Sequence, residues 1–216
     1  MNYIYILLEV LIVFLLMIFS YKYGKKDGLY VYIGFMSAIG SIIVGTVDIL
    51  SFQVSIGIPI IMGIFICSNV IIQRYGIDEV KRILYTYGAS YIISFILIGL
   101  VSLIIPSNNV FDLLFGYNLN NVRCFIGTFI SIMIMIWIGS GIYYSLRKNK
   151  NILIISNVVT SFVISFIESL ICILMAYTGI FSGIELFGMI SIRYVFEVIV
   201  SIIGLIPVYI LVKYLD

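Results

Sequence analysis

The composition of this chain of 216 residues excludes an ordinary water-soluble domain. Hydrophobic residues make up 63% of the chain and charged residues 10%, whereas soluble domains are about half apolar and about one quarter charged. The formal net charge of +2, without a basic cluster, gives no indication of nucleic-acid binding. Divided into spans of about 20 apolar residues, the length accommodates roughly seven membrane-spanning helices. We therefore expect one polytopic membrane domain over residues 1–216.

The residue types also restrict the chemistry. The chain has no histidine, which excludes imidazole as a base, a proton relay or a metal ligand. Its three cysteines stand far apart inside apolar runs, so we expect neither a metal site nor a disulfide framework; they are Cys67, Cys124 and Cys172. The sequence contains no glycine-rich phosphate loop and no intramembrane nucleophile with a base. We expect a protein that is not an enzyme, binds no cofactor or metal and has no ATPase of its own.

Seven apolar runs predict an all-α integral membrane protein. They cover residues 3–21, 29–50, 54–72, 83–105, 122–146, 152–180 and 184–215. The first run lacks a following cleavage site of small residues, so we interpret it as a retained helix. Pro59 is expected to kink or restart the third helix. The last two runs exceed one bilayer crossing, which predicts that they tilt, break or extend beyond the membrane.

The basic residues predict the orientation of these helices. Every second gap between the runs is basic, and these gaps hold ten of the twelve Lys and Arg residues, namely Lys22, Lys25, Lys26, Arg74, Lys81, Arg82, Arg147, Lys148, Lys150 and Lys213. The other gaps contain no Lys or Arg. Cytoplasmic loops carry an excess of these residues, so the alternation predicts an outer N-terminus and a cytoplasmic C-terminus.

A stripe of polar residues runs along the sixth predicted helix. Its members recur every three or four positions and therefore share one face; they are Asn157, Thr160, Ser161, Ser165, Glu168, Ser169 and Cys172. Two interpretations stay open. For the hydroxyl groups we favour hydrogen bonds between helices, and for Glu168 we favour a substrate cavity, because a carboxylate at membrane depth is costly.

Other polar residues add to the candidate site. Arg193 and Glu197 lie four residues apart on the seventh helix, where they either neutralise each other or bind a substrate. Tyr194 offers a ring for stacking on a planar ligand. Ser68, Asn69 and Gln73 lie near the cytoplasmic end of the third helix, and they either bind a ligand by hydrogen bonds or cap that helix end.

Two of these stretches resemble the queuosine precursor transporter family, also described as vitamin uptake transporters. In that family one helix ends with threonine and aspartate, a glutamate, and then Tyr-Gly before a basic helix start. SNVIIQRYGIDEVKRIL is similar, with Ser68, Asn69 and Gln73 as the counterparts of the three polar residues. SNVVTSFVISFIESL resembles a second family stretch that includes the positions of Asn157 and Glu168. In the family's final helix, lysine is usual where this chain has Glu197.

The resemblance implies a six-helix core with an extra N-terminal helix, in a multi-pass importer of the bacterial inner membrane. It implies 7-deazaguanine bases as substrates, which are planar and neutral. The candidate substrate-binding residues are Ser68, Asn69, Gln73, Asn157, Ser161, Ser165, Glu168, Tyr194 and Glu197. Among them we expect Glu168 to accept the ring N–H and amino group of the base. The side-chain amides would bind its other polar groups, and Tyr194 would stack on its ring.

Two other functions fit the same observations. The chain would also suit the substrate-binding component of an energy-coupling-factor importer, with coupling subunits as partners, or a membrane interaction protein that does not transport. The expected partners are otherwise the lipid bilayer, a planar base-like small molecule and a second copy of the chain. Facilitated diffusion and proton coupling through Glu168 are both compatible with the sequence.

Overall fold

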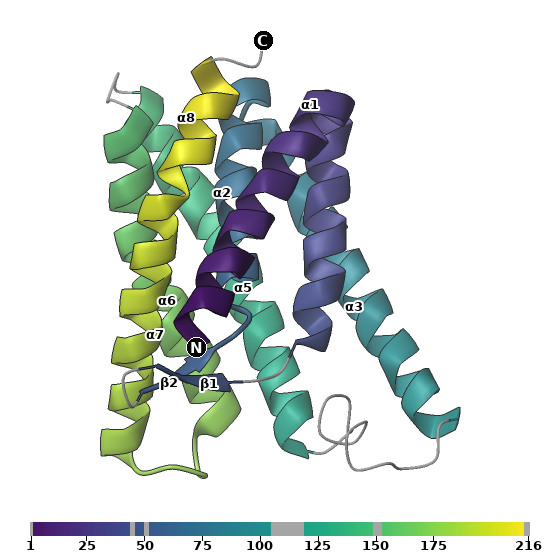
Figure 1. Ribbon diagram of the computed structural model, residues 1–216, viewed down its shortest axis with the longest axis vertical. Helices are drawn as coiled ribbons and strands as arrows, with labels where there is room; N and C mark the ends of the chain where they lie inside the picture. Colours follow the sequence, from purple (N-terminus) through teal and green to yellow (C-terminus); the bar gives the residue numbers. More distant parts are fainter. Residues whose placement is uncertain (1, 44–45, 50–51, 105–118, 149–152, 214–216) are drawn as a thin grey trace.

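The computed structural model describes residues 2–43, 46–49, 52–104, 119–148 and 153–213, which form a bundle of long helices (Figure 1). The polar stretch 107–121, which we expect to form an external loop between the fourth and fifth apolar runs, lies almost entirely outside these residues. In chain order the elements are α1 (Asn2–Ile42), β1 (Thr46–Ile49), β2 (Phe52–Ser55), α2 (Ile58–Tyr75), a short 3-10 helix (Ile77–Glu79), α3 (Val80–Ile104), α5 (Leu119–Lys148), α6 (Leu153–Tyr177), α7 (Gly183–Ile203) and α8 (Leu205–Lys213).

The long helix α1 consists of two helical segments that meet at Lys25. There the backbone adopts φ 49° and ψ −127°, and the second segment returns beside the first (Figure 1). Gly28 permits the return, because a Cβ atom at this position would lie 1.9 Å from the carbonyl oxygen of Ser20. The apolar stretch Ile4–Ile42 has 39 residues, about twice what one bilayer crossing needs. With α1 crossing twice, the described residues provide the seven crossings that the sequence predicts.

A β-hairpin that was not predicted from the sequence separates the second and third crossings. The helix before the hairpin ends at Ile42 rather than at residue 50, and the helix after it begins at Ile58 rather than at residue 54. The two strands are antiparallel, with Thr46 opposite Ser55. Pro59 lies in the first turn of α2, where its missing N–H is not needed. It therefore starts this helix and does not kink it.

The last predicted run is broken into α7 and α8, as its length indicated. Helix α7 begins with a capping box in which Ser182 and Glu185 bond each other's backbone N–H groups. Gly204 separates α7 from α8, and a Cβ atom there would lie 2.1 Å from Ile66 and 2.8 Å from Phe14. The glycine therefore allows close packing of this junction on α1 and α2.

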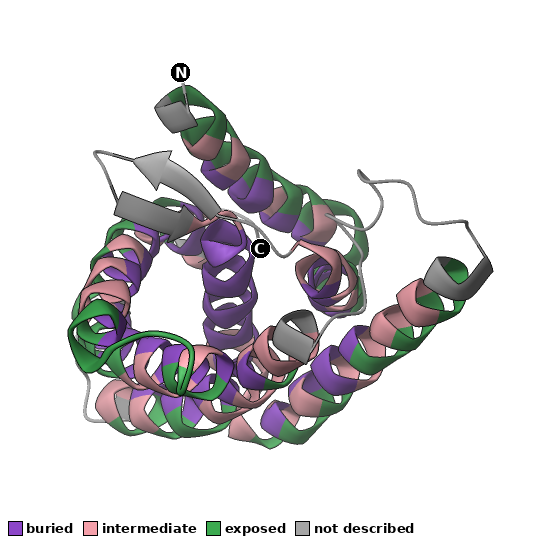
Figure 2. Ribbon diagram, turned by 90° about the horizontal axis from the view of Figure 1, so that it is seen from below, coloured by how far each residue is buried: buried purple, intermediate pink, exposed green. Residues whose placement is uncertain are grey.

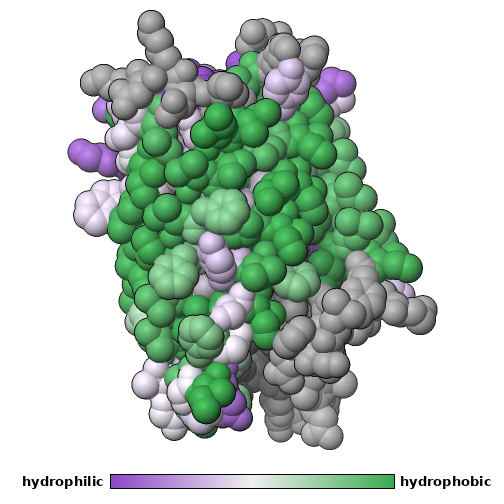
Figure 3. Space-filling model, turned by 90° about the vertical axis from the view of Figure 1, so that its left-hand side faces the viewer, coloured by the Kyte–Doolittle hydropathy of each residue, from purple (hydrophilic) through white to green (hydrophobic). Residues whose placement is uncertain are grey.

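The core of the bundle forms around α2, in which every residue from 58 to 72 is buried. In Figure 2 buried residues gather on the inner sides of the helices and exposed residues on the outer sides. The face drawn in Figure 3 is largely apolar between more polar ends. Large apolar side chains on an outer surface are those expected to contact lipid. The all-α membrane fold predicted from the sequence is confirmed, with the short hairpin as an addition.

The predicted basic gaps lie at one end of the bundle, which we call the basic end. The break at Lys25, the C-terminal ends of α2 and α5 and the C-terminal end of α8 are all at this end, opposite the N-terminus and the β-hairpin (Figure 1). We call the opposite end the hairpin end. The alternation of basic and non-basic gaps along the sequence thus corresponds to the two ends of the bundle. Which end faces the cytoplasm stays a prediction from the positive-inside rule.

Candidate functional site

The polar stripe predicted on α6 faces the protein interior. All seven of its members are buried, and Ser165 and Glu168 have no exposed surface. On the other side of the same helix, Phe162, Val163 and Phe166 are exposed. Helices α5 and α7 pack against α6, so they cover the polar side while the apolar side faces outward.

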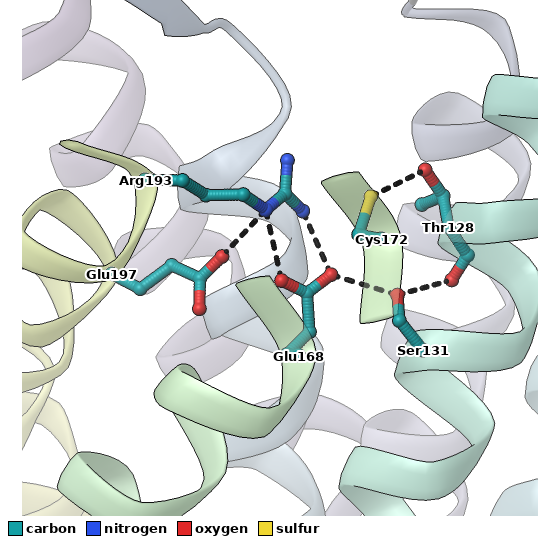
Figure 4. Close-up of polar contacts among 6 residues, drawn as sticks. All are labelled: Thr128, Ser131, Glu168, Cys172, Arg193 and Glu197. Atoms are coloured by element: carbon teal, nitrogen blue, oxygen red, sulfur yellow. Dashed lines mark hydrogen bonds and ion pairs between the residues drawn. The ribbon is translucent and has the colours of Figure 1, made fainter. Parts of the chain in front are cut away.

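At the centre of this buried region lies a charged trio, formed by Glu168, Arg193 and Glu197 (Figure 4). Arg193 donates two hydrogen bonds to Glu168, from Nη2 to Oε1 at 2.7 Å and from Nε to Oε2 at 2.9 Å. Glu197 Oε1 forms an ion pair with Arg193 Nε at 2.9 Å. The Arg193 side chain is 8% exposed, and the two glutamates are fully buried.

The trio lies near the middle of the membrane-spanning segments. Glu197 is close to the midpoint of the span Gly183–Val212, which has 30 residues. Buried charges so far from water are stable only when paired. In their ionised forms, two carboxylates and one guanidinium carry one negative charge in excess. The trio is therefore incompletely neutralised by its own members.

The two carboxylates of the trio differ in the number of hydrogen bonds that their oxygens accept. Glu168 accepts the two bonds from Arg193 and a third from the hydroxyl of Ser131 at 2.8 Å. Neither oxygen of Glu197 accepts a hydrogen bond from the described residues, and the hydroxyls of Ser165 and Ser169 also lack partners there. A carboxylate has about four acceptor positions. Glu197 therefore has the greater free capacity to bind a ligand.

Three of the predicted residues belong to a second polar group, which we call the amide cluster. Asn69 on α2 donates from Nδ2 to Asn157 Oδ1 on α6 at 3.1 Å. Gln73 Oε1 accepts from Tyr143 at 3.1 Å and from Arg147 Nε at 2.7 Å, both on α5. The Oδ1 atom of Asn69 is buried and accepts no hydrogen bond from the part of the chain that the structure describes. The amide cluster joins three helices near the basic end.

The structure does not bring all predicted site residues together. Asn157 and Glu168 are eleven residues apart on α6, which places their Cα atoms about 16 Å apart along the helix axis. The amide cluster and the charged trio are thus two separate groups. Ser161 and Ser165 lie between them on the same side of α6. Ser68 donates to the backbone carbonyl of Ile64 at 2.8 Å, so its hydroxyl serves its own helix.

Tyr194 does not lie with the charged trio. Its ring meets that of Phe166 edge to face, with 5.9 Å between the centroids, and Phe166 is 50% exposed. Adjacent helical residues point about 100° apart. With Arg193 directed inward, Tyr194 is therefore turned toward the outer side of α6 and α7. This arrangement differs from the prediction that Tyr194 stacks on a ligand held by Glu168.

Two groups of polar residues on α5 were not singled out from the sequence. Ser131 bonds Glu168, and Thr128 contacts the Cys172 sulfur at 3.6 Å (Figure 4). Tyr143 and Arg147 bond Gln73. Thr128 and Ser131 are three residues apart, a helical spacing that places them on one side. This short pattern was the available signal, although two hydroxyl groups on an apolar helix more often join neighbouring helices.

Residues 55–212 match the family described as "Putative vitamin uptake transporter". The matched region begins in β2 and includes both the charged trio and the amide cluster, while α1 and β1 precede it. No curated protein and no solved structure matches the chain. The resemblance to this family predicted from the sequence is confirmed. The chain is a multi-pass inner-membrane protein that belongs to the vitamin uptake transporter family.

Proposed function

We propose that this protein imports a queuosine precursor, a 7-deazaguanine base, and holds it at the charged trio. The observation that carries this proposal is that the buried Glu197 carboxyl group, whose Oε1 forms an ion pair with Arg193, accepts no hydrogen bond from the described residues. A buried polar group without a partner costs about 1–3 kcal/mol. A ligand that supplies the missing bonds removes this cost, so Glu197 favours a bound molecule with polar groups on one edge.

A 7-deazaguanine base has such an edge. It carries a ring carbonyl, a ring N–H and an exocyclic amino group side by side, and a carboxyl group forms two parallel hydrogen bonds with two neighbouring groups of this kind. The hydroxyls of Ser165 and Ser169 on α6 are buried without a hydrogen-bond partner among the described residues, so they offer further bonds to a ligand. Glu168 is less suited to this role than we expected from the sequence, because Arg193 and Ser131 occupy most of its acceptor positions.

The amide cluster supports a role in transport, because it lies between the charged trio and the basic end. In addition to its bonds at Asn69 and Gln73, α2 is joined to α8 by a hydrogen bond from Arg74 to the Leu211 carbonyl. A substrate that leaves the trio toward the basic end must pass this region. We infer that these bonds between helices rearrange when the site opens to that side, as alternating access requires.

Uptake in cells tests the proposal. The chain is expressed in a bacterium that lacks queuosine synthesis and its own importer, each precursor is supplied at low concentration with the matching salvage enzymes, and queuosine in tRNA is measured. We expect at least one precursor to restore queuosine. Glu197→Ala should remove most of this uptake, because two hydrogen bonds are lost at about 1–3 kcal/mol for each group left unpaired.

Glu185→Gln is the matched control for this experiment. It changes an exposed carboxylate on the same helix, and glutamine is also accepted in a capping box. Wild-type protein that is present in the membrane but restores no queuosine with any precursor would contradict the proposal. Equal uptake by Glu197→Ala and Glu185→Gln would move the binding site away from the trio.

A further inference from the structure

We propose that the charged trio binds one proton at Glu197 and that this proton crosses the membrane with the substrate, so that the protein is a proton symporter. The inference rests on the proposed function and adds its driving force. Two observations support it, namely the excess negative charge of the trio and the Glu197 oxygens, which accept no hydrogen bond from the described residues.

The ionised charges of the trio do not balance. Glu168 and Glu197 face a single guanidinium, and all three side chains are buried. An unneutralised charge in the middle of a membrane is costly. A 7-deazaguanine base is neutral, so it adds no compensating charge when it binds. One bound cation makes the loaded trio neutral. In this neutral state the site can change its access from one side of the membrane to the other at the lowest electrostatic cost.

The cation that restores neutrality is a proton and not a metal ion. A metal ion near Glu197 would lie against the Arg193 guanidinium, whose Nε atom is 2.9 Å from Glu197 Oε1, and the two positive charges would repel each other. The described residues contain no group of three acidic or cysteine side chains able to hold a metal. A proton needs one oxygen atom and no coordination shell. The surroundings therefore favour a proton over a metal ion.

The proton resides on Glu197 and not on Glu168. Glu168 accepts two bonds from Arg193 and one from Ser131, and these bonds favour its ionised form. Glu197 has its ion pair with Arg193 but accepts no hydrogen bond from the described residues. A protonated carboxyl group donates one hydrogen bond and accepts another. It thus matches the ring carbonyl and adjacent N–H of the base, so proton and substrate stabilise each other in the site.

The other titratable groups around Glu197 do not compete for this role. Arg193 shares its helix, and α6 contributes Glu168 and the Cys172 thiol. On α2, Cys67 bonds the Leu29 carbonyl and Arg74 bonds the Leu211 carbonyl, so both are directed toward other helices. In α8, Tyr209 is partly exposed, and strand β2 has no titratable residue. The proton comes from the outer solution, resides on a Glu197 oxygen and leaves with the base on the other side.

Transport by purified protein in sealed vesicles tests the inference. Vesicles first receive unlabelled base inside and labelled base outside, without any ion gradient, which measures exchange alone. A pH gradient, acidic outside, is then imposed with the membrane potential clamped at zero. For a stoichiometry of one proton, we expect the labelled base to accumulate about tenfold for each unit of pH difference. An internal pH dye should record one proton taken up for each base.

The two proposals fail in different ways. Exchange without accumulation in the pH gradient would overturn proton coupling and leave the importer function intact, whereas no exchange with any 7-deazaguanine base would overturn both. Accumulation in a sodium gradient at constant pH would also overturn the assignment of a proton. Glu197→Gln carries no titratable proton, so we expect its accumulation ratio to stay at one in the pH gradient. A ratio equal to that of the control Glu185→Gln would place the proton elsewhere.

Discussion

Replacement of Arg193 by methionine removes the only cation of the charged trio and leaves two buried carboxylates facing each other. Glu168 loses hydrogen bonds of 2.7 and 2.9 Å, and Glu197 loses an ion pair of 2.9 Å. Loss of one partner from a buried pair costs about 3–5 kcal/mol, because the remaining charge stays buried. We therefore expect Arg193→Met to lower the free energy of unfolding by about this amount.

Lys26→Met is the matched control, since it removes a cation from a more accessible pair. Lys26 lies 2.6 Å from Glu79, with 33% and 18% of the two side chains exposed, and such pairs contribute about 0–1 kcal/mol. Unfolding of both variants in mixed micelles, with increasing denaturing detergent, measures the difference. In Arg193→Met, an added Glu168→Gln change should recover part of the loss. Equal losses for Arg193→Met and Lys26→Met would refute the electrostatic reasoning.

Three further predictions follow from the packing and the polar groups. Gly28→Ala should destabilise the protein by about 1–3 kcal/mol through overpacking, because the new Cβ atom would lie 1.9 Å from the carbonyl oxygen of Ser20. Gly24→Ala is the control, since a Cβ atom there has no neighbour within 4 Å. Thermal unfolding in detergent compares the two variants, and equal stability would contradict the close packing at Gly28. Gln73→Leu removes the acceptor of two hydrogen bonds and should cost about 1–3 kcal/mol in the same assay; no loss would mean that the amide cluster contributes nothing to stability. The orientation can be tested with single cysteines in a background without the native ones. An impermeant thiol reagent should label Thr178→Cys at the hairpin end in intact cells, and Lys22→Cys at the basic end only after permeabilisation. The reverse pattern would mean that the basic end faces outward.

The number of crossings was predictable because apolar runs and basic gaps reflect the bilayer itself. The break at Lys25 lies in the gap that separates the first two runs, and the stripe on α6 is buried as its helical spacing indicated. The hairpin was not predicted, because its apolar residues continue the apolar runs of the two flanking helices along the sequence. Its signal was the alternation in TVDI and FQVS, a period of two that a count of apolar residues does not detect.

The composition of the site was only partly predictable, because it depends on distances between helices. Glu168 and Asn157 share one stripe, but the length of α6 between them separates the trio from the amide cluster. The pairing of Arg193 with Glu197 was one of two interpretations of their spacing of four residues, while the stronger contact with Glu168 comes from a different helix. Tyr194 was assigned by its residue type alone, and its neighbour Arg193 determines which side it occupies.

Binding of a 7-deazaguanine base to the purified protein tests the central claim most directly. Titration calorimetry in detergent compares the wild-type protein, Glu197→Ala and the control Glu185→Gln, and a folding check by size-exclusion chromatography accompanies each. If the trio is the substrate site, wild type and Glu185→Gln bind the base with similar affinity, and folded Glu197→Ala binds it at least tenfold more weakly, as a loss of about 1.4 kcal/mol or more requires. Equal affinity for all three proteins would contradict the assignment of Glu197 to the substrate site.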